Sequence, residues 1–248
     1  MKLLLLLLAL PMIGFGQNVN IPDANFKAYL LGNTKINTNG NKKIHVSEAR
    51  AFNDTIDCSE MNIYNLKGIE AFTALTYLDC NENQLTSLNI RKNTALTKLD
   101  CRKNKLTSLK VRGASALTTL SCSINQLISL DLSKNTALTY LGCDDNKLTS
   151  LNISKNTSLY QMDCNENQLT SLNISGASHL TKLDCRKNKL TSLNISGAYA
   201  LISLNCSDNQ LTSLDISKNI ALRKFSCFGN KFDCDALISK YGIENHGE

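Results

Sequence analysis

Residues 75–95 have the sequence LTYLDCNENQLTSLNIRKNTA, and residues 96–116 have the sequence LTKLDCRKNKLTSLKVRGASA. The two stretches align without a gap, and the same step of 21 residues continues through most of the chain. One slot of the pattern holds cysteine and another holds asparagine. The cysteines are Cys80, Cys101, Cys122, Cys143, Cys164, Cys185, Cys206 and Cys227, and the asparagines are Asn83, Asn104, Asn125, Asn146, Asn167, Asn188, Asn209 and Asn230. A fixed period of this length indicates a repeat array in which each turn reuses the same structural positions.

A second, weaker period divides each turn into a 10-residue half and an 11-residue half. Leu75, Leu78 and Cys80 are spaced like Leu85, Leu88 and Ile90. The alternation of apolar residues predicts a short strand in each half. We expect the main strand at residues 78–80 and a shorter strand or extended segment at residues 88–90. An α-helix would need about 10 residues of helical periodicity, so neither half has room for one.

The order of apolar residues and asparagine matches the pattern L-x-x-L-x-L-x-x-N/C-x-L, with cysteine at the third apolar place. The match runs from about Thr55 to Phe232. In this respect the chain resembles secreted bacterial leucine-rich-repeat proteins of the Bacteroidota type, in which each repeat carries a nested half-period. The resemblance implies an α/β-type repeat solenoid that is mostly β. It should form a right-handed superhelix with a parallel sheet, short extended convex segments and small capping helices.

The first residues have the features of a signal peptide. Lys2 supplies a positive start, Leu3 to Leu10 form a short apolar core, and Gly14-Phe15-Gly16 places small residues at a cleavage site. The apolar run is shorter than the roughly 20 residues of a membrane span. We therefore expect a signal peptide at residues 1–16, no membrane span, and a protein that is secreted or held at the cell surface. An N-terminal cap at 17–54, the repeat array at 55–232 and a C-terminal cap at 233–248 should follow, because an open solenoid end would expose its core.

The cysteine slot is expected to be structural. Free cysteine is among the most buried residue types, and no Cys-x-x-Cys pair or neighbouring histidine suggests a zinc site. We expect eight or more free thiols and neither metal nor cofactor. Cys227 and Cys234 are the one plausible bonded pair, and their state is left open. The net charge of +6, or +5 once Lys2 is removed with the signal peptide, is too small and too mixed in sign to predict nucleic-acid binding.

The sequence shows no arrangement typical of catalysis. The histidines His45, His179 and His246 are scattered, and the many serines and threonines occupy repeat slots without a base beside them. Residues 37–48 can be compared with a calcium loop, but glycine stands at the fourth position and two lysines follow. We interpret that segment as a turn leading into residues 46–52, and the chain as a protein without enzymatic activity.

The positions that vary from turn to turn indicate a binding surface. Alternate residues of a strand face opposite sides, so the residues on either side of Leu78 should point outward onto the concave sheet. This face is predicted to carry two basic bands, around Arg102 and Arg186, with acidic residues between them. The candidate contact residues are Tyr77, Lys98, Arg102, Tyr140, Asp144, Asp163, Lys182 and Arg186. The predicted function is extracellular recognition of a protein or glycan by a monomer, and the alternative is a structural surface or matrix component without a specific ligand.

Overall fold

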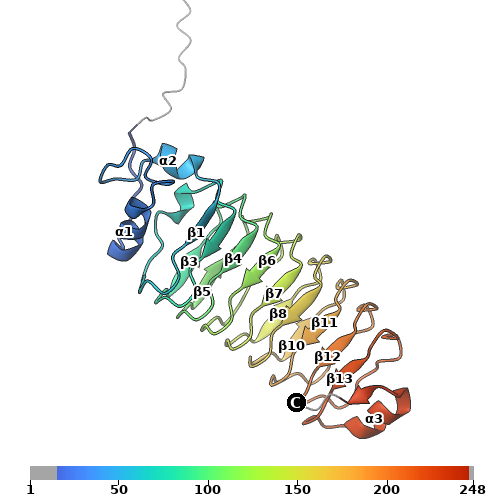
Figure 1. Ribbon diagram of the computed structural model, residues 1–248. Coiled ribbons are helices and arrows are strands. Elements are labelled where there is room, and N and C mark those ends of the chain that lie inside the picture. The colour runs from blue at the N-terminus through green and yellow to red at the C-terminus, as the bar shows by residue number, and fades with distance from the viewer. Residues whose placement is uncertain (1–15, 246–248) are drawn as a thin grey trace, which may run out of the picture.

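The computed structural model describes residues 16–245 and shows a parallel-sheet solenoid of about eight turns (Figure 1). The predicted fold class is confirmed. Each turn contributes one strand to the main sheet, in which neighbouring turns pair in register at the 21-residue step of the sequence. The sheet has ten strands, because β1 before the array's regular turns and β14 after α3 pair with its two ends. Residues 1–15, where most of the expected signal peptide falls, lie outside the described residues.

The main sheet has the strand order β1-β2-β4-β6-β7-β9-β11-β12-β13-β14. The strands are short, and all their pairings are parallel. Their bounds are β1 Thr55–Asp57, β2 Tyr77–Asp79, β4 Lys98–Asp100, β6 Thr119–Ser121, β7 Tyr140–Gly142, β9 Gln161–Asp163, β11 Lys182–Asp184, β12 Ser203–Asn205, β13 Lys224–Ser226 and β14 Glu244–Asn245.

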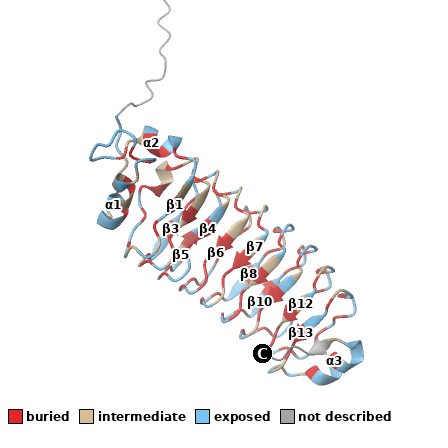
Figure 2. Cartoon of the chain, in the orientation of Figure 1, coloured by how far each residue is buried: buried red, intermediate tan, exposed pale blue. Residues whose placement is uncertain are grey.

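The alternation of burial along each strand follows the predicted phase. Leu78 and Cys80 are fully buried, whereas Tyr77 and Asp79 lie on the outer side and are half-buried. The same alternation recurs in most strands of the main sheet (Figure 2), whereas Asp100, Gly142 and Ser226 are buried at the position that Asp79 occupies in β2. The strand begins and ends one residue earlier than predicted, since β2 covers Tyr77–Asp79. The Cys80 amide still continues the ladder by donating to the carbonyl of Asp100 at 2.8 Å.

The asparagine slot closes each turn through its side-chain amide. Asn104 donates from Nδ2 to the carbonyls of Cys80, Cys101 and Arg102 at 3.0–3.2 Å, and its Oδ1 accepts from the Leu85 amide at 2.9 Å. Buried backbone groups must find partners, and each turn supplies them with one buried amide.

A residue in the left-handed conformation comes just before each of these asparagines. It turns the chain after the strand so that the asparagine can point inward. Glycine, asparagine and aspartate tolerate this conformation best. The chain nevertheless places longer or branched residues at several of these positions. They are Glu82, Lys103, Ile124, Glu166 and Lys187, with φ between 50° and 56°.

The second half of each turn forms paired strands at only two places. β3 Ser87–Asn89 pairs with β5 Ser108–Lys110, and β8 Ser150–Asn152 pairs with β10 Ser171–Asn173. In both pairs the strand of the later turn is followed by Gly-Ala, at residues 113–114 and 176–177. The strand of the earlier turn is followed by Lys-Asn, at residues 92–93 and 155–156.

Glycine explains this pairing. A Cβ on Gly113 would lie 1.8 Å from the carbonyl oxygen of Arg91, and one on Gly176 would lie 2.1 Å from that of Ser154. Only glycine allows the two backbones to approach so closely. Gly197, where the distance is 2.7 Å, follows another Gly-Ala turn and has no paired short strand.

Both ends of the array are covered. α1 Ala24–Gly32 buries Phe26 and Leu30, and the side chain of Asp23 caps its first turn by accepting from the Phe26 amide. α2 Val46–Ala51 and the short 3-10 helix η1 Ile69–Ala71 complete this end. α3 Cys234–Tyr241 packs on the last turn, where Cys234 forms a disulfide with Cys227.

Candidate binding surface

The outer face of the main sheet, which we call the sheet face, carries three columns of side chains along the solenoid. The first column is Tyr77, Lys98, Thr119, Tyr140, Gln161, Lys182, Ser203 and Lys224. The second is Asp79, Asp100, Ser121, Gly142, Asp163, Asp184, Asn205 and Ser226, and the third is Asn81, Arg102, Ser123, Asp144, Asn165, Arg186, Ser207 and Phe228. All eight candidate residues predicted from the sequence lie in these columns, so the fold brings them onto one face.

The first column is the most accessible of the three. Lys98 and Lys182 are exposed, and each stands between two uncharged neighbours on the adjacent strands. Tyr140 is half-buried beside Gly142, where the absence of a side chain leaves room for the ring. Tyr77 is also half-buried, and its hydroxyl donates to Asp79 at 3.0 Å. Burial, followed by this bond to a carboxylate, raises the pKa of Tyr77 to about 12.

The two predicted basic bands are largely neutralised by neighbouring carboxylates. Arg102 donates to Asp100 through Nε at 3.0 Å and Nη2 at 2.6 Å, and the Asp100 side chain is only 11% exposed. This bond to Asp100 raises the pKa of Arg102. In the second band Arg186 lies 3.5 Å from Asp184. The adjacent lysines of both bands are paired as well, Lys103 with Glu82 at 2.6 Å and Lys187 with Glu166 at 2.8 Å.

The arginines therefore hold the sheet face together as well as lining it. A bidentate guanidinium bond to a nearly buried carboxylate offsets the cost of burying that charge. Replacing Arg102 would leave Asp100 without its partner, so we expect it to affect folding. Arg102 is therefore important for stability although its side chain points away from the core.

The acidic candidates lie between the two bands, as predicted. Asp144 accepts a bond from the Ser123 hydroxyl, and Asp163 accepts from the amide and side chain of Asn165. Burial raises the pKa of Asp163, and the nearby carboxylates of Asp144 and Asp184 add to the effect. The middle of the sheet face thus offers oriented but partly desolvated carboxylates.

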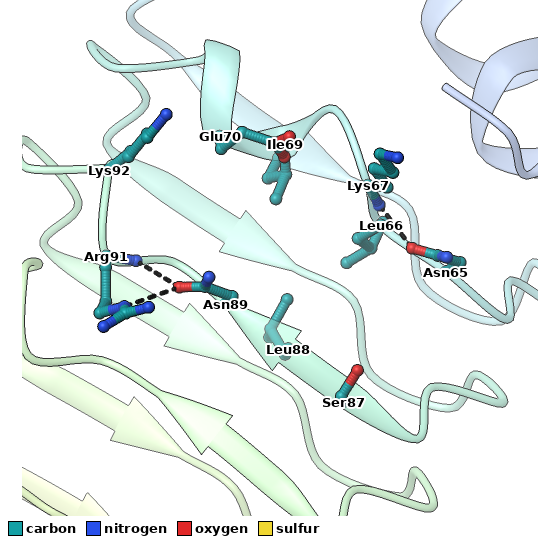
Figure 3. A pocket seen from close by; sticks show the side chains of 10 residues that line it. All are labelled: Asn65, Leu66, Lys67, Ile69, Glu70, Ser87, Leu88, Asn89, Arg91 and Lys92. Carbon is teal, nitrogen blue, oxygen red and sulfur yellow. Dashed lines mark hydrogen bonds between the residues drawn. The ribbon is translucent and has the colours of Figure 1, made fainter. Parts of the chain in front are cut away.

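Two features outside the sheet face are accounted for by local structure. A hollow of about 450 Å³ lies between residues 65–70 and the loop around β3, because β3 pairs only with β5 (Figure 3). Its polar groups are partly bonded among themselves, as where Asn89 accepts from Arg91. In the segment compared with a calcium loop, the Glu48 carboxylate accepts from Thr38, Asn39 and His45, so protein donors already satisfy it.

Prediction from the sequence missed exposed apolar residues on the loops that lead into the main strands. Residues 76, 97, 118, 139, 160, 181, 202 and 223 immediately precede these strands, and we call them the threonine slot. Five of the eight are threonine, but Tyr160 and Ile202 are 57% and 45% exposed. The signal was present in the sequence as a departure from the repeat at these two positions, just outside the strands.

The comparisons with known proteins agree with this architecture. No family model and no curated protein matches the sequence. Among solved structures, the functional domain of InlJ from Listeria monocytogenes, which includes a cysteine ladder, is 32% identical, with a TM-score of 0.65 over 90% of this chain and 55% of that one. A leucine-rich-repeat protein of Leptospira interrogans is 23% identical, with a TM-score of 0.60 over 78% and 59% of the two chains. Internalin C2 of Listeria monocytogenes is 17% identical, with a TM-score of 0.62 over 90% and 93%.

The chain spans little more than half the length of the first two of these structures. The likeness to InlJ includes the feature that dominates the sequence, a column of cysteines at one step of the repeat. No helix in residues 16–245 is long and apolar enough to cross a membrane. By its fold, this chain is a leucine-rich-repeat solenoid.

Proposed function

We propose that the chain is an extracellular, non-catalytic binding module that recognises a protein through its sheet face. Repeat solenoids use such extended surfaces for binding. The observation that supports the proposal most is that the sequence varies from turn to turn on the sheet face and not in the core. Core slots keep the same residue types from turn to turn, whereas the first and third columns of the sheet face change between aromatic, basic, acidic and small side chains.

The character of the sheet face favours a protein over a glycan. Positive and negative groups alternate within a few ångströms, as at Arg102 and Asp100, and a protein surface can match such a mixture with its own charges. The tyrosines Tyr77 and Tyr140 are half-buried, so neither ring is fully open for the stacking by which aromatic side chains bind sugars.

The test is a binding comparison between matched variants of the full secreted chain. Extracellular proteins captured by the parent chain would be purified, and their affinities measured for Lys98→Ala and Tyr140→Ala. Lys155→Ala, exposed on the loop that follows β8, is the control. We expect each sheet-face change to weaken binding about fivefold or more, with little change in the melting temperature, because anchors of this kind dominate interfaces.

Full affinity in both sheet-face variants would exclude this face as the contact surface. Binding to a glycan array that both variants lose would move the ligand class from protein to glycan. The extracellular location is tested separately, by N-terminal sequencing of exported protein. We expect the sequence to begin at or near Gln17, and retention of Met1 would contradict export through a cleaved signal peptide.

A further inference from the structure

The threonine slot has a structural role where it holds threonine. The hydroxyls of Thr97, Thr118 and Thr139 each donate to the carbonyl of the slot residue one turn earlier, at 3.0–3.1 Å. The bond ties the side chain to the backbone and holds neighbouring turns together along the edge of the sheet face. Any residue without a hydroxyl at this slot gives up one turn-to-turn bond.

Tyr160 and Ile202 give up that bond, and each leaves about half of its side chain in water. Neither belongs to the buried core. The exposed part of an apolar side chain brings no folding energy, and the threonine that it replaces would bring a hydrogen bond. Folding therefore does not account for the exposed apolar surface of these two residues, and contact with a partner would.

The two side chains form the walls of a hollow. They belong to turns on either side of the one that contributes Thr181, and strands at this spacing place them about 10 Å apart. Thr181 keeps its bond to the Tyr160 carbonyl at 3.1 Å and forms a low floor between them. The hollow measures about 400 Å³ and is lined by Tyr160, Gln161, Thr181, Lys182, Ile202, Ser203 and Lys224. A gap of this width admits one apolar side chain between the two walls.

The charge of the hollow is entirely positive. None of its lining residues is acidic, and Lys182 and Lys224 stand in the first column on either side of Ser203. Among residues 16–243, whose side chains are described, no carboxylate lies within 4.0 Å of the Lys182 ammonium. This contrasts with the two basic bands, where the arginines and their neighbouring lysines are paired.

We propose that this hollow binds a protein segment in which one apolar side chain is flanked by aspartate or glutamate. The apolar side chain enters between Tyr160 and Ile202 above Thr181, and the acidic residues meet Lys182 and Lys224. The proposal rests on the proposed function and names the chemistry of the partner. Two further exposed residues, Tyr199 and Ile220, lie on the loops that lead into β12 and β13.

The experiment uses short peptides and NMR spectroscopy of the full secreted chain labelled with ¹⁵N. The probe is an acetylated, amidated heptapeptide with one central phenylalanine and three aspartates on each side. One comparison peptide replaces phenylalanine by serine, and the other replaces the aspartates by asparagine. We expect the probe to shift the amides of residues 160–161, 181–182 and 202–203, and to bind at least tenfold more tightly than either comparison peptide.

The decisive variant restores the repeat. Tyr160→Thr with Ile202→Thr puts the consensus residue back at both positions, so it should fold and lose at least tenfold in affinity for the probe. Ile128→Thr is the matched control, because Ile128 is an exposed isoleucine in the equivalent slot of the other half-turn and lies outside the hollow. It should leave probe binding unchanged.

Equal binding of all three peptides, no amide shifts at the hollow, or full affinity in the double variant would each refute the proposal. A sulfated hexasaccharide that binds the double variant as well as the parent, but not Lys182→Ala, would assign the lysines to an acidic glycan instead. A protein partner that loses affinity with Lys98→Ala and Tyr140→Ala, but not with the double variant, would leave the proposed function intact and overturn this inference alone.

Discussion

The cysteine column makes the stability of the fold sensitive to alkaline pH. Eight free cysteines are buried inside the array, one in each turn before the last. Burial raises the pKa of the Cys143 thiol well above its ordinary value, and it raises the pKa of Cys206 to about 12. The unfolded chain would expose the same thiols to water, where they ionise with a pKa of about 8.5.

The direction and size of the effect follow from proton linkage. Below the unfolded pKa both states hold the thiol protons, so stability does not depend on them. Above it the unfolded state releases protons that the folded state keeps, and stability falls as pH rises toward the folded pKa. Each thiol contributes a slope of about 1.4 kcal/mol per pH unit, and eight contribute roughly 11 kcal/mol per unit. Since whole domains are stable by about 5–15 kcal/mol, the protein should unfold at roughly pH 9–10.

Urea unfolding followed by circular dichroism between pH 7.5 and 10 measures this slope. Thiol counting on denatured protein should first find the eight free cysteines. The control is Cys143→Ala, which should cost about 1–2 kcal/mol at pH 7.5 through lost packing. Because it removes one titrating thiol and no other, its slope should be smaller by about 1.4 kcal/mol per pH unit. Identical slopes in the variant and the parent, or a flat stability up to pH 10, would refute the reasoning.

Two further substitutions test the backbone of the turns by urea unfolding. Gly113→Ala should destabilise the protein by about 2–3 kcal/mol, because the new Cβ meets a carbonyl oxygen of the preceding turn. Gly32→Ala, whose Cβ would have nothing within 4 Å, should be neutral or slightly stabilising, and equal effects at the two sites would contradict the close-approach argument. Ile124→Asn should stabilise the fold by about 1 kcal/mol, because Ile124 has φ 56° and asparagine tolerates that conformation. A loss of stability there would mean that the isoleucine makes packing contacts that outweigh the strain.

The fold could be predicted from the sequence because one environment is repeated. A slot that holds cysteine in one turn holds it in the next, and each copy lies in the same place relative to its neighbours. The phase of the strand followed from Leu78 and Cys80, since residues two apart share a side of the sheet. The bond between Cys227 and Cys234 was left open because sequence spacing does not fix the directions of two Cβ atoms, whereas the structure places the Cα atoms 5.7 Å apart.

Other features depend on contacts between neighbouring turns, which the sequence of a single turn does not determine. Gly113 and Gly197 both stand in Gly-Ala turns, but only the turn of Gly113 forms a paired short strand. The backbone at Gly113 also lies closer to the carbonyl of the preceding turn than the backbone at Gly197 does. The difference arises because the turn before Gly113 is of the Lys-Asn kind. The pairing of Arg102 with Asp100 is similar, since it depends on how far a flexible side chain folds back along its own strand. Both therefore lay beyond prediction from the sequence.

The candidate surface extends beyond the residues inside each strand. Following only the residues inside each strand led to the sheet face and passed over the slot immediately before it. Each residue can be compared with the residue that the other turns have at the same slot, and with the bond that this residue makes. Tyr160 and Ile202 differ from the threonine of the other turns, because they lose its hydrogen bond and stay about half exposed. Ile124 differs from the other turns because its branched side chain is held at a strained φ. In an array whose turns otherwise follow one pattern, residues that break the pattern and stay largely exposed are the first to test for binding.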